Sequence, residues 1–312
     1  MTTRFDSLTR PKSGDDYRVK SKYRTLGFGI AFIGMMLAVV TLIANIAAAN
    51  SDNPSSAGEI LAWSFGLTTL AFGTIKLGIS VILIGILIRL WHRVTAVEES
   101  LPKLKAQAEA PAPRGDVKTE FGAATETATV PEPLRIHTMA RTLWFPMLAM
   151  GYMAVLVGFI LSLVWAGSVA DGTQQAVSAW TAGIQFFGEA LVLAGISFLL
   201  GSILGALREG GGQVQESLGL PVRVLKMPVT AKLFVAFMAL GMMVGMIQLV
   251  LYAVAAAVGN PQSFAAWSAW LGPFREFSLG LLLAGIVLAL VTIGNGLSFQ
   301  FSRLREIVTT GK

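Results

Sequence analysis

Four ionisable side chains, Lys76, Glu189, Arg275 and Glu276, interrupt long apolar stretches of the sequence. A charge at the centre of a bilayer costs about 2.5–3.5 kcal/mol on insertion scales, so such residues normally face the protein interior and pair with one another. Two kinds of chemistry are open to them. One is a buried ion pair that fixes how helices pack. The other is a water-filled vestibule that binds an ion or a polar solute.

Side chains for other chemistry are sparse. The chain has no cysteine, which excludes disulfides, thiolate metal sites and thiol nucleophiles. Its two histidines, His92 and His137, fall outside the apolar stretches, whereas membrane haem and di-iron sites need several ligands within one bundle. No phosphate-binding loop, Ser-His-Asp arrangement or zinc motif is present, and the glycines at 210–212 are typical of a flexible helix exit. We therefore expect no enzyme, no cofactor and no metal.

The apolar stretches predict an all-α integral membrane protein. Of the 312 residues, 54% are hydrophobic and only 13% are charged, whereas a soluble domain carries roughly a quarter charged residues. A helix needs about 20 apolar residues to cross a bilayer. Six stretches are long enough, and they predict transmembrane helices near residues 25–49, 66–91, 143–167, 182–206, 232–258 and 274–301.

The basic residues predict the orientation of these helices. All of the 24 Lys and Arg residues except Lys76 and Arg275 lie in the two terminal tails and in segments 88–142 and 207–232. Basic residues collect on the cytoplasmic side of membrane proteins, so both termini are predicted to be cytoplasmic. The net charge of +6 then reflects topology, with the lipid bilayer as partner and no nucleic acid. With no targeting segment recognised, we expect a bacterial-type inner membrane. No basic residue occurs in the loops near 50–62, 168–179 and 259–269.

A tandem repeat organises the six helices. The three helix pairs align without gaps, and the second helix of each begins with L-A-W or S-A-W and continues to K-L-G-I or L-A-G-I. All three pairs enter the membrane from the same side, and such parallel repeats are related by an axis along the membrane normal. We therefore predict three parallel helical hairpins in a pseudo-threefold bundle. In each copy, 44 residues separate two shared glycines: Gly34 and Gly78, Gly151 and Gly195, Gly241 and Gly285.

The repeat also predicts where the charges lie. Relative to the shared L-x-G-I segment, Lys76 is at the first position, Glu189 is four residues earlier and Arg275 is eight residues earlier. Steps of four return to one helix face and rise about 6 Å each. Gln185 occupies the position of Arg275, and Glu276 follows directly. These side chains form our candidate polar network, within which we predict a Lys76–Glu189 pair between neighbouring hairpins.

The non-membrane segments complete the expected organisation. The connector 93–140 is rich in Pro, Ala and Glu and cannot bury enough apolar surface to order itself, so it is predicted to be a disordered cytoplasmic linker. The full division is a cytoplasmic tail at 1–24, hairpin 1 at 25–92, the linker at 93–140, hairpin 2 at 141–208, a cytoplasmic loop at 209–230, hairpin 3 at 231–302 and a cytoplasmic tail at 303–312.

Two function classes follow from these patterns, and a membrane enzyme, which no recognised motif supports, is a third hypothesis. The short external loops and the lack of a catalytic constellation favour a non-catalytic scaffold or accessory subunit, with protein partners in an inner-membrane assembly. The alternative is a small solute or ion transporter, or a channel-like protein, that uses the intramembrane Lys-Glu-Arg face. Below Lys76 the sequence is apolar to the cytoplasmic edge, so a polar path would end as a pocket rather than an open pore.

Overall fold

Six long helices make up most of the fold. The computed structural model describes residues 21–91, 124–127, 129–130, 132–167, 174–217, 219, 222–225, 227–258 and 261–310. Each of the six helices contains a segment long and apolar enough to cross a membrane, which confirms the prediction of an all-helical, multi-pass membrane protein. They are α2 (Ser21–Ala49), α3 (Pro54–Trp91), α5 (Arg135–Gly167), α6 (Gln174–Ser217), α7 (Val229–Ala257) and α8 (Pro261–Thr310).

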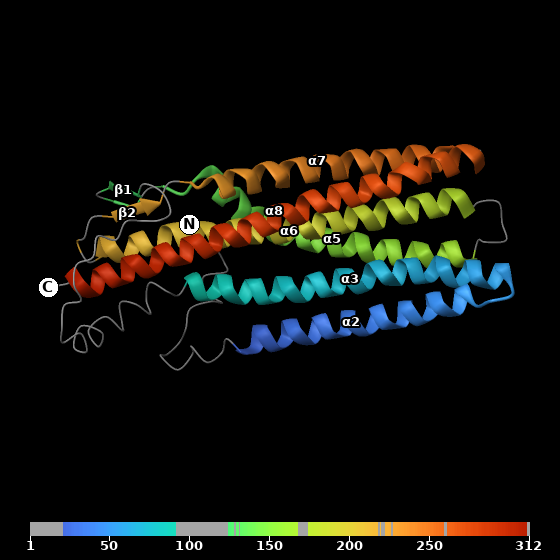
Figure 1. Cartoon of the computed structure of the whole chain (residues 1–312), viewed down its shortest axis with the longest axis horizontal. Coiled ribbons are helices and arrows are strands. Elements are labelled where there is room, and N and C mark those ends of the chain that lie inside the picture. The colour runs from blue at the N-terminus through green and yellow to red at the C-terminus, as the bar shows by residue number, and fades with distance from the viewer. Residues whose placement is uncertain are drawn as a thin grey trace.

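The helices alternate in direction and form three hairpins, α2–α3, α5–α6 and α7–α8 (Figure 1). The starts of α2, α5 and α7 and the ends of α3, α6 and α8 lie at one end of the bundle, which we call the strand end because two short strands lie there. The opposite end, where the hairpins turn, is called the turn end. Asn53 shows how a hairpin turns: its side chain accepts the backbone N–H of Ser55 at 3.0 Å and Pro54 follows it, a favourable start for α3.

The middle hairpin lies between the other two. Helix α3 packs on α5 and α6, and α6 packs on both α7 and α8, whereas no comparable helix-to-helix packing joins the first and third hairpins within the described residues. This layered order differs from the pseudo-threefold bundle expected from sequence, in which all three hairpins would contact one another equally. Small residues along α6 let neighbours approach on every side. As a result, 89% of its apolar segment is buried, against 17% for α2.

Close backbone contact holds each hairpin together. A Cβ atom on Gly34 would lie 2.9 Å from the backbone N of Ile75, and one on Gly151 would lie 2.6 Å from that of Val192. Such a Cβ would force the helices apart, so glycine at these positions is what permits the observed helix separation. The residues that meet the three first-helix glycines are Ile75 for Gly34, Val192 for Gly151 and Leu282 for Gly241, each 41 positions later in the sequence.

A small two-stranded sheet caps the strand end of α6. Strand β1 (Ala124–Thr127) pairs antiparallel with β2 (Val222–Leu225). The turn after α6 contains Gly219, whose positive φ of 67° is one that glycine adopts readily. The backbone N–H of Arg223 then donates to the Gln215 side chain at 3.1 Å, which fastens β2 to the last turns of α6.

Three segments expected from sequence to lie outside the hairpins contain regular secondary structure. The linker predicted over 93–140 contains β1 and the start of α5, and its residues 93–123 lie outside the described part. The loop predicted over 209–230 contains the end of α6 and β2, so the glycines at 210–212 continue the helix instead of ending it. The tail predicted from 303 is helical to Thr310. Strand pairing and packing against α6, which local composition does not report, join β1 and β2 to the bundle.

Candidate functional site

The polar network predicted from the sequence centres on Glu189 of α6. This residue is only 4% exposed. Its Oε1 lies 3.1 Å from Lys76 Nζ of α3, and its Oε2 lies 3.6 Å from Arg275 Nη2 of α8. The structure therefore brings Lys76 and Glu189 together, as the repeat alignment predicts, and adds Arg275 on the other side. One carboxylate joins all three hairpins.

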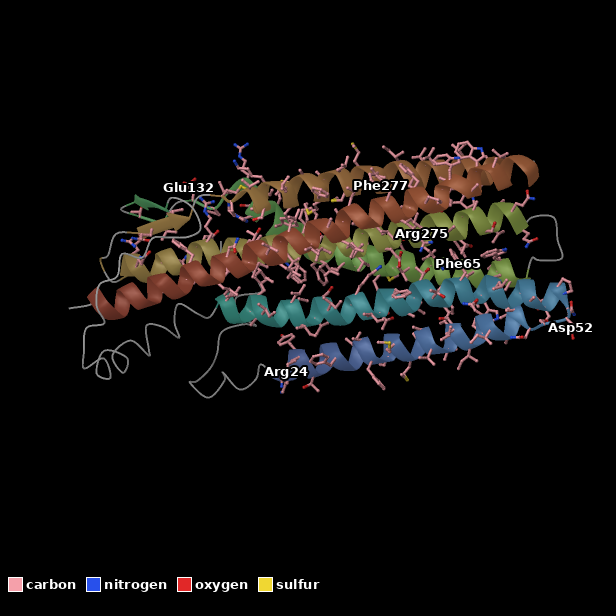
Figure 2. The ribbon with its side chains drawn as sticks, viewed as in Figure 1. Arg24, Asp52, Phe65, Glu132, Arg275 and Phe277 are labelled. Carbon is pink, nitrogen blue, oxygen red and sulfur yellow. The ribbon has the colours of Figure 1, made fainter. Side chains whose placement is uncertain are left out.

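Besides Glu189, Arg275 lies near two other side chains, those of Phe65 and Glu276. Its guanidinium carbon lies 5.9 Å from the centre of the Phe65 ring of α3, a cation–π contact. Figure 2 labels both residues, which lie toward the turn end of the bundle. Its Nε lies 3.7 Å from Glu276 Oε1, but the Glu276 side chain is 73% exposed. Glu276 thus belongs to the outer surface of α8, and the structure does not bring it into the buried network.

Gln185 extends the network by one turn along α6. It is fully buried, and its Oε1 accepts the Thr69 hydroxyl of α3 at 3.1 Å. Its Nε2 has no hydrogen-bond partner in the described structure. A Cβ on Gly158 of α5 would overlap the Gln185 side chain, so this glycine makes the room that the amide occupies.

Sequence reasoning missed Phe65, Thr69 and Gly158. Thr69 precedes Lys76 by seven residues and therefore shares its helix face, a spacing that was available in the sequence. The roles of Phe65 and Gly158 depend on which helices become neighbours, and no local pattern reports that.

The network links side chains from all three hairpins. Two cations face Glu189, and the second carboxylate, Glu276, stands beside Arg275 on the outside. Helix α7 also approaches closely at this level, because Gly183 of α6 lies against Tyr252 and Gly245 of α7 lies against Ala190. The arrangement can bind hairpins to each other. It lies apart from the well-formed cavity described next, whose lining includes none of these charged residues.

A cavity of about 440 Å³ lies nearer the strand end, among α5, α6, α7 and α8. His137 lines it, with Nδ1 3.2 Å from the Gly201 carbonyl, so this histidine packs on α6. Beside it, Arg141 Nη2 and Glu209 Oε2 form an ion pair at 2.6 Å. His92 lies outside the described residues.

The described residues hold no group of three or more His, Cys, Asp or Glu side chains placed to bind a metal ion. Comparison with known proteins gives no match either. No family model, curated protein or solved structure aligns significantly with this chain.

Proposed function

We propose that the chain is a non-catalytic scaffold or accessory subunit of an inner-membrane protein assembly. The observation that carries this proposal is Glu276. Its carboxylate is 73% exposed on the outer surface of an apolar helix, and the long contact with Arg275 Nε, at 3.7 Å, is its one ion pair among the described residues. Most of this carboxylate therefore faces outward, where a charge is costly unless it pairs more fully. A partner helix that donates a hydrogen bond or a positive charge would offset that cost.

The surface around Glu276 suits a helical partner. Phe277 is 56% exposed, and a Cβ on Gly280, one turn further, would meet no atom within 4 Å. An exposed small residue lets a second helix approach closely in a membrane. The inward charges Lys76, Glu189 and Arg275 meanwhile form ion pairs with one another, which supports a structural role for them.

The second candidate function is a transporter or channel-like protein. The unpartnered Gln185 amide, buried one turn from Glu189, is the observation that favours it. A solute bound there would accept a hydrogen bond from this amide. Such a protein would purify alone and would be stabilised by its solute, and replacement of Gln185 by Leu would abolish that protection.

Co-purification tests the scaffold. We expect the full chain, extracted in mild detergent, to retain a stoichiometric membrane partner that a photo-crosslinker at Phe277 captures. Glu276→Gln and Gly280→Leu should each reduce this capture. Matched controls are Glu59→Gln, another exposed carboxylate, and Gly29→Leu on α2, where a Cβ also meets nothing within 4 Å. A chain that purifies alone, with no crosslinked partner at Phe277, contradicts the proposal.

The proposed orientation places the strand end in the cytoplasm. The clustering of basic residues in the tails and in the connectors between hairpins supports it. Asp52 and Glu132 are exposed at opposite ends of the bundle (Figure 2). Because the chain has no cysteine, Asp52→Cys and Glu132→Cys give single labelling sites. An impermeant maleimide added to cells should label the first and not the second, and the reverse result contradicts the orientation.

We also infer that the three hairpins are copies of one unit. The shared 44-residue spacing between glycines and the equal 41-residue separation of the contacts made by Gly34, Gly151 and Gly241 support this inference. Chance alignment of apolar residues would not give the same contact in each hairpin. Because the three glycines permit the same close contact between helices, replacing any one of them should reduce stability in the same way.

A further inference from the structure

The cavity near the strand end is lined by exposed residues on one side and by buried residues further in. Its exposed lining residues, Leu134 and Met227, lie in the segments that lead into α5 and α7, whereas Phe234 and Met238 are 4% and 8% exposed. Along α6 the lining runs from Ser197 to Arg208, a span of twelve residues and therefore about 16 Å of helix. The volume of about 440 Å³ lies within the range of roughly 300–1,000 Å³ found for small-molecule sites.

The walls of this cavity are largely apolar and carry one cation. Most polar side chains that line it are already bonded to protein: His137 to the Gly201 carbonyl, Thr292 to the Leu288 carbonyl and Gln300 to the Leu207 carbonyl. The Ser197 hydroxyl is buried and has no hydrogen-bond partner among the described residues, but it carries no charge. The one basic side chain in the lining besides His137 is that of Arg208.

Arg208 lacks an acidic partner in the described part of the chain. The carboxylate of its neighbour Glu209 is bound by Arg141, and the carboxylate of Glu216 accepts the backbone N–H of Val130 at 3.4 Å. Arg208 is half-buried at the strand end of the cavity lining. Its guanidinium therefore presents donors at one end of an elongated apolar space, and guanidinium matches phosphate geometry well.

We propose that this cavity binds an anionic phospholipid, with one acyl chain in the apolar part and the phosphate on Arg208. Two properties support a lipid. The site opens between membrane-spanning helices, and its cation lies at the helix ends where the chain's other basic residues cluster. Basic pockets between transmembrane helices on the cytoplasmic side bind acidic headgroups. The site is separate from the Glu276 surface, so the proposed partner interaction and the lipid site can fail independently.

Lipid binding to the purified full chain tests this proposal. Native mass spectrometry would compare dioleoyl phosphatidylglycerol, dioleoyl phosphatidylcholine, oleic acid and inorganic phosphate. We expect one tightly held phosphatidylglycerol and weaker phosphatidylcholine. Arg208→Gln should weaken phosphatidylglycerol binding by about fivefold or more, the effect of one basic residue at an anionic surface. The matched control is Lys232→Gln, an exposed basic residue on α7 that does not line the cavity, which should leave binding unchanged.

A second variant fills the apolar part of the cavity. Gly296 lines it, and a Cβ there would meet only Leu207, at 3.7 Å. Gly296→Phe should therefore weaken both phospholipids. If that variant does not accumulate, Val235→Phe, which enlarges another half-buried lining side chain, replaces it.

Three results would overturn the proposal. Equal binding of the two phospholipids would remove the role of charge. Equal losses from Arg208→Gln and Lys232→Gln would indicate a delocalised lipid shell. Oleic acid or phosphate binding that depends on Arg208, without phosphatidylglycerol binding, would assign the site to another ligand.

Discussion

Helix α6 has two polar regions that differ in how their charges are satisfied. Near the turn end, Glu189 faces cations from both flanking hairpins, and Gly183 and Gly158 bring the neighbouring helices close. Near the strand end, Arg208 faces an apolar cavity and no acidic partner among the described residues. We propose that the paired charge stabilises packing between hairpins, whereas the charge without an acidic partner is available to a ligand.

The largest expected effect is at Glu189. Glu189→Leu leaves both Lys76 and Arg275 without their carboxylate, and the loss of one partner from a buried ion pair costs about 3–5 kcal/mol. Lys76→Met should cost less, because Arg275 still pairs with the carboxylate. Thermal unfolding in a neutral detergent measures the loss of stability in each variant. Equal or reversed losses would show that Glu189 does not bridge the two cations.

The next effect is at the hairpin glycines. Gly34→Ala, Gly151→Ala and Gly241→Ala should each destabilise by about 1–3 kcal/mol, because each Cβ would press on the facing helix. Gly29→Ala serves as the control, since a Cβ there meets nothing within 4 Å. Because alanine has a higher helix propensity than glycine, Gly29→Ala should be neutral or slightly stabilising. The comparison uses the same thermal assay, and a uniform effect at all four positions would contradict close packing.

The smallest effect is at the strand-end ion pair. The Arg141 side chain is 34% exposed and the Glu209 side chain 16%, so their pair is partly open to solvent and more exposed than the Glu189 network. Exposed pairs contribute about 0–1 kcal/mol, so Arg141→Gln should shift the unfolding temperature only slightly. Added salt should make this change in unfolding temperature smaller still. A loss as large as that of Glu189→Leu would remove the distinction between the two regions of α6.

Local sequence patterns were sufficient for the helices and for one contact of the network. Apolar length predicts six spans, and the position of Lys76 and Glu189 relative to a shared segment predicts their pairing. Both inferences need only helix periodicity and the cost of an unpaired charge in a membrane.

The remaining features depend on long-range packing. The alternating V-R-V-L of β2 was a strand signal, but its pairing with β1 joins segments about 100 residues apart, which no local pattern specifies. Likewise, the central position of α6, the outward placement of Glu276 and the cavity at Arg208 all follow from which hairpins become neighbours.

A double-mutant cycle on Lys76 and Glu189 tests most directly whether buried charges hold the hairpins together. Unfolding free energies would be measured for Lys76→Met, Glu189→Leu and the double variant in one detergent. We predict that the double variant is more stable than the sum of the single losses implies, with a coupling of about 0.5–3 kcal/mol, because no cation is then left at Lys76. Losses that add without coupling would contradict a structural ion pair between the first and second hairpins.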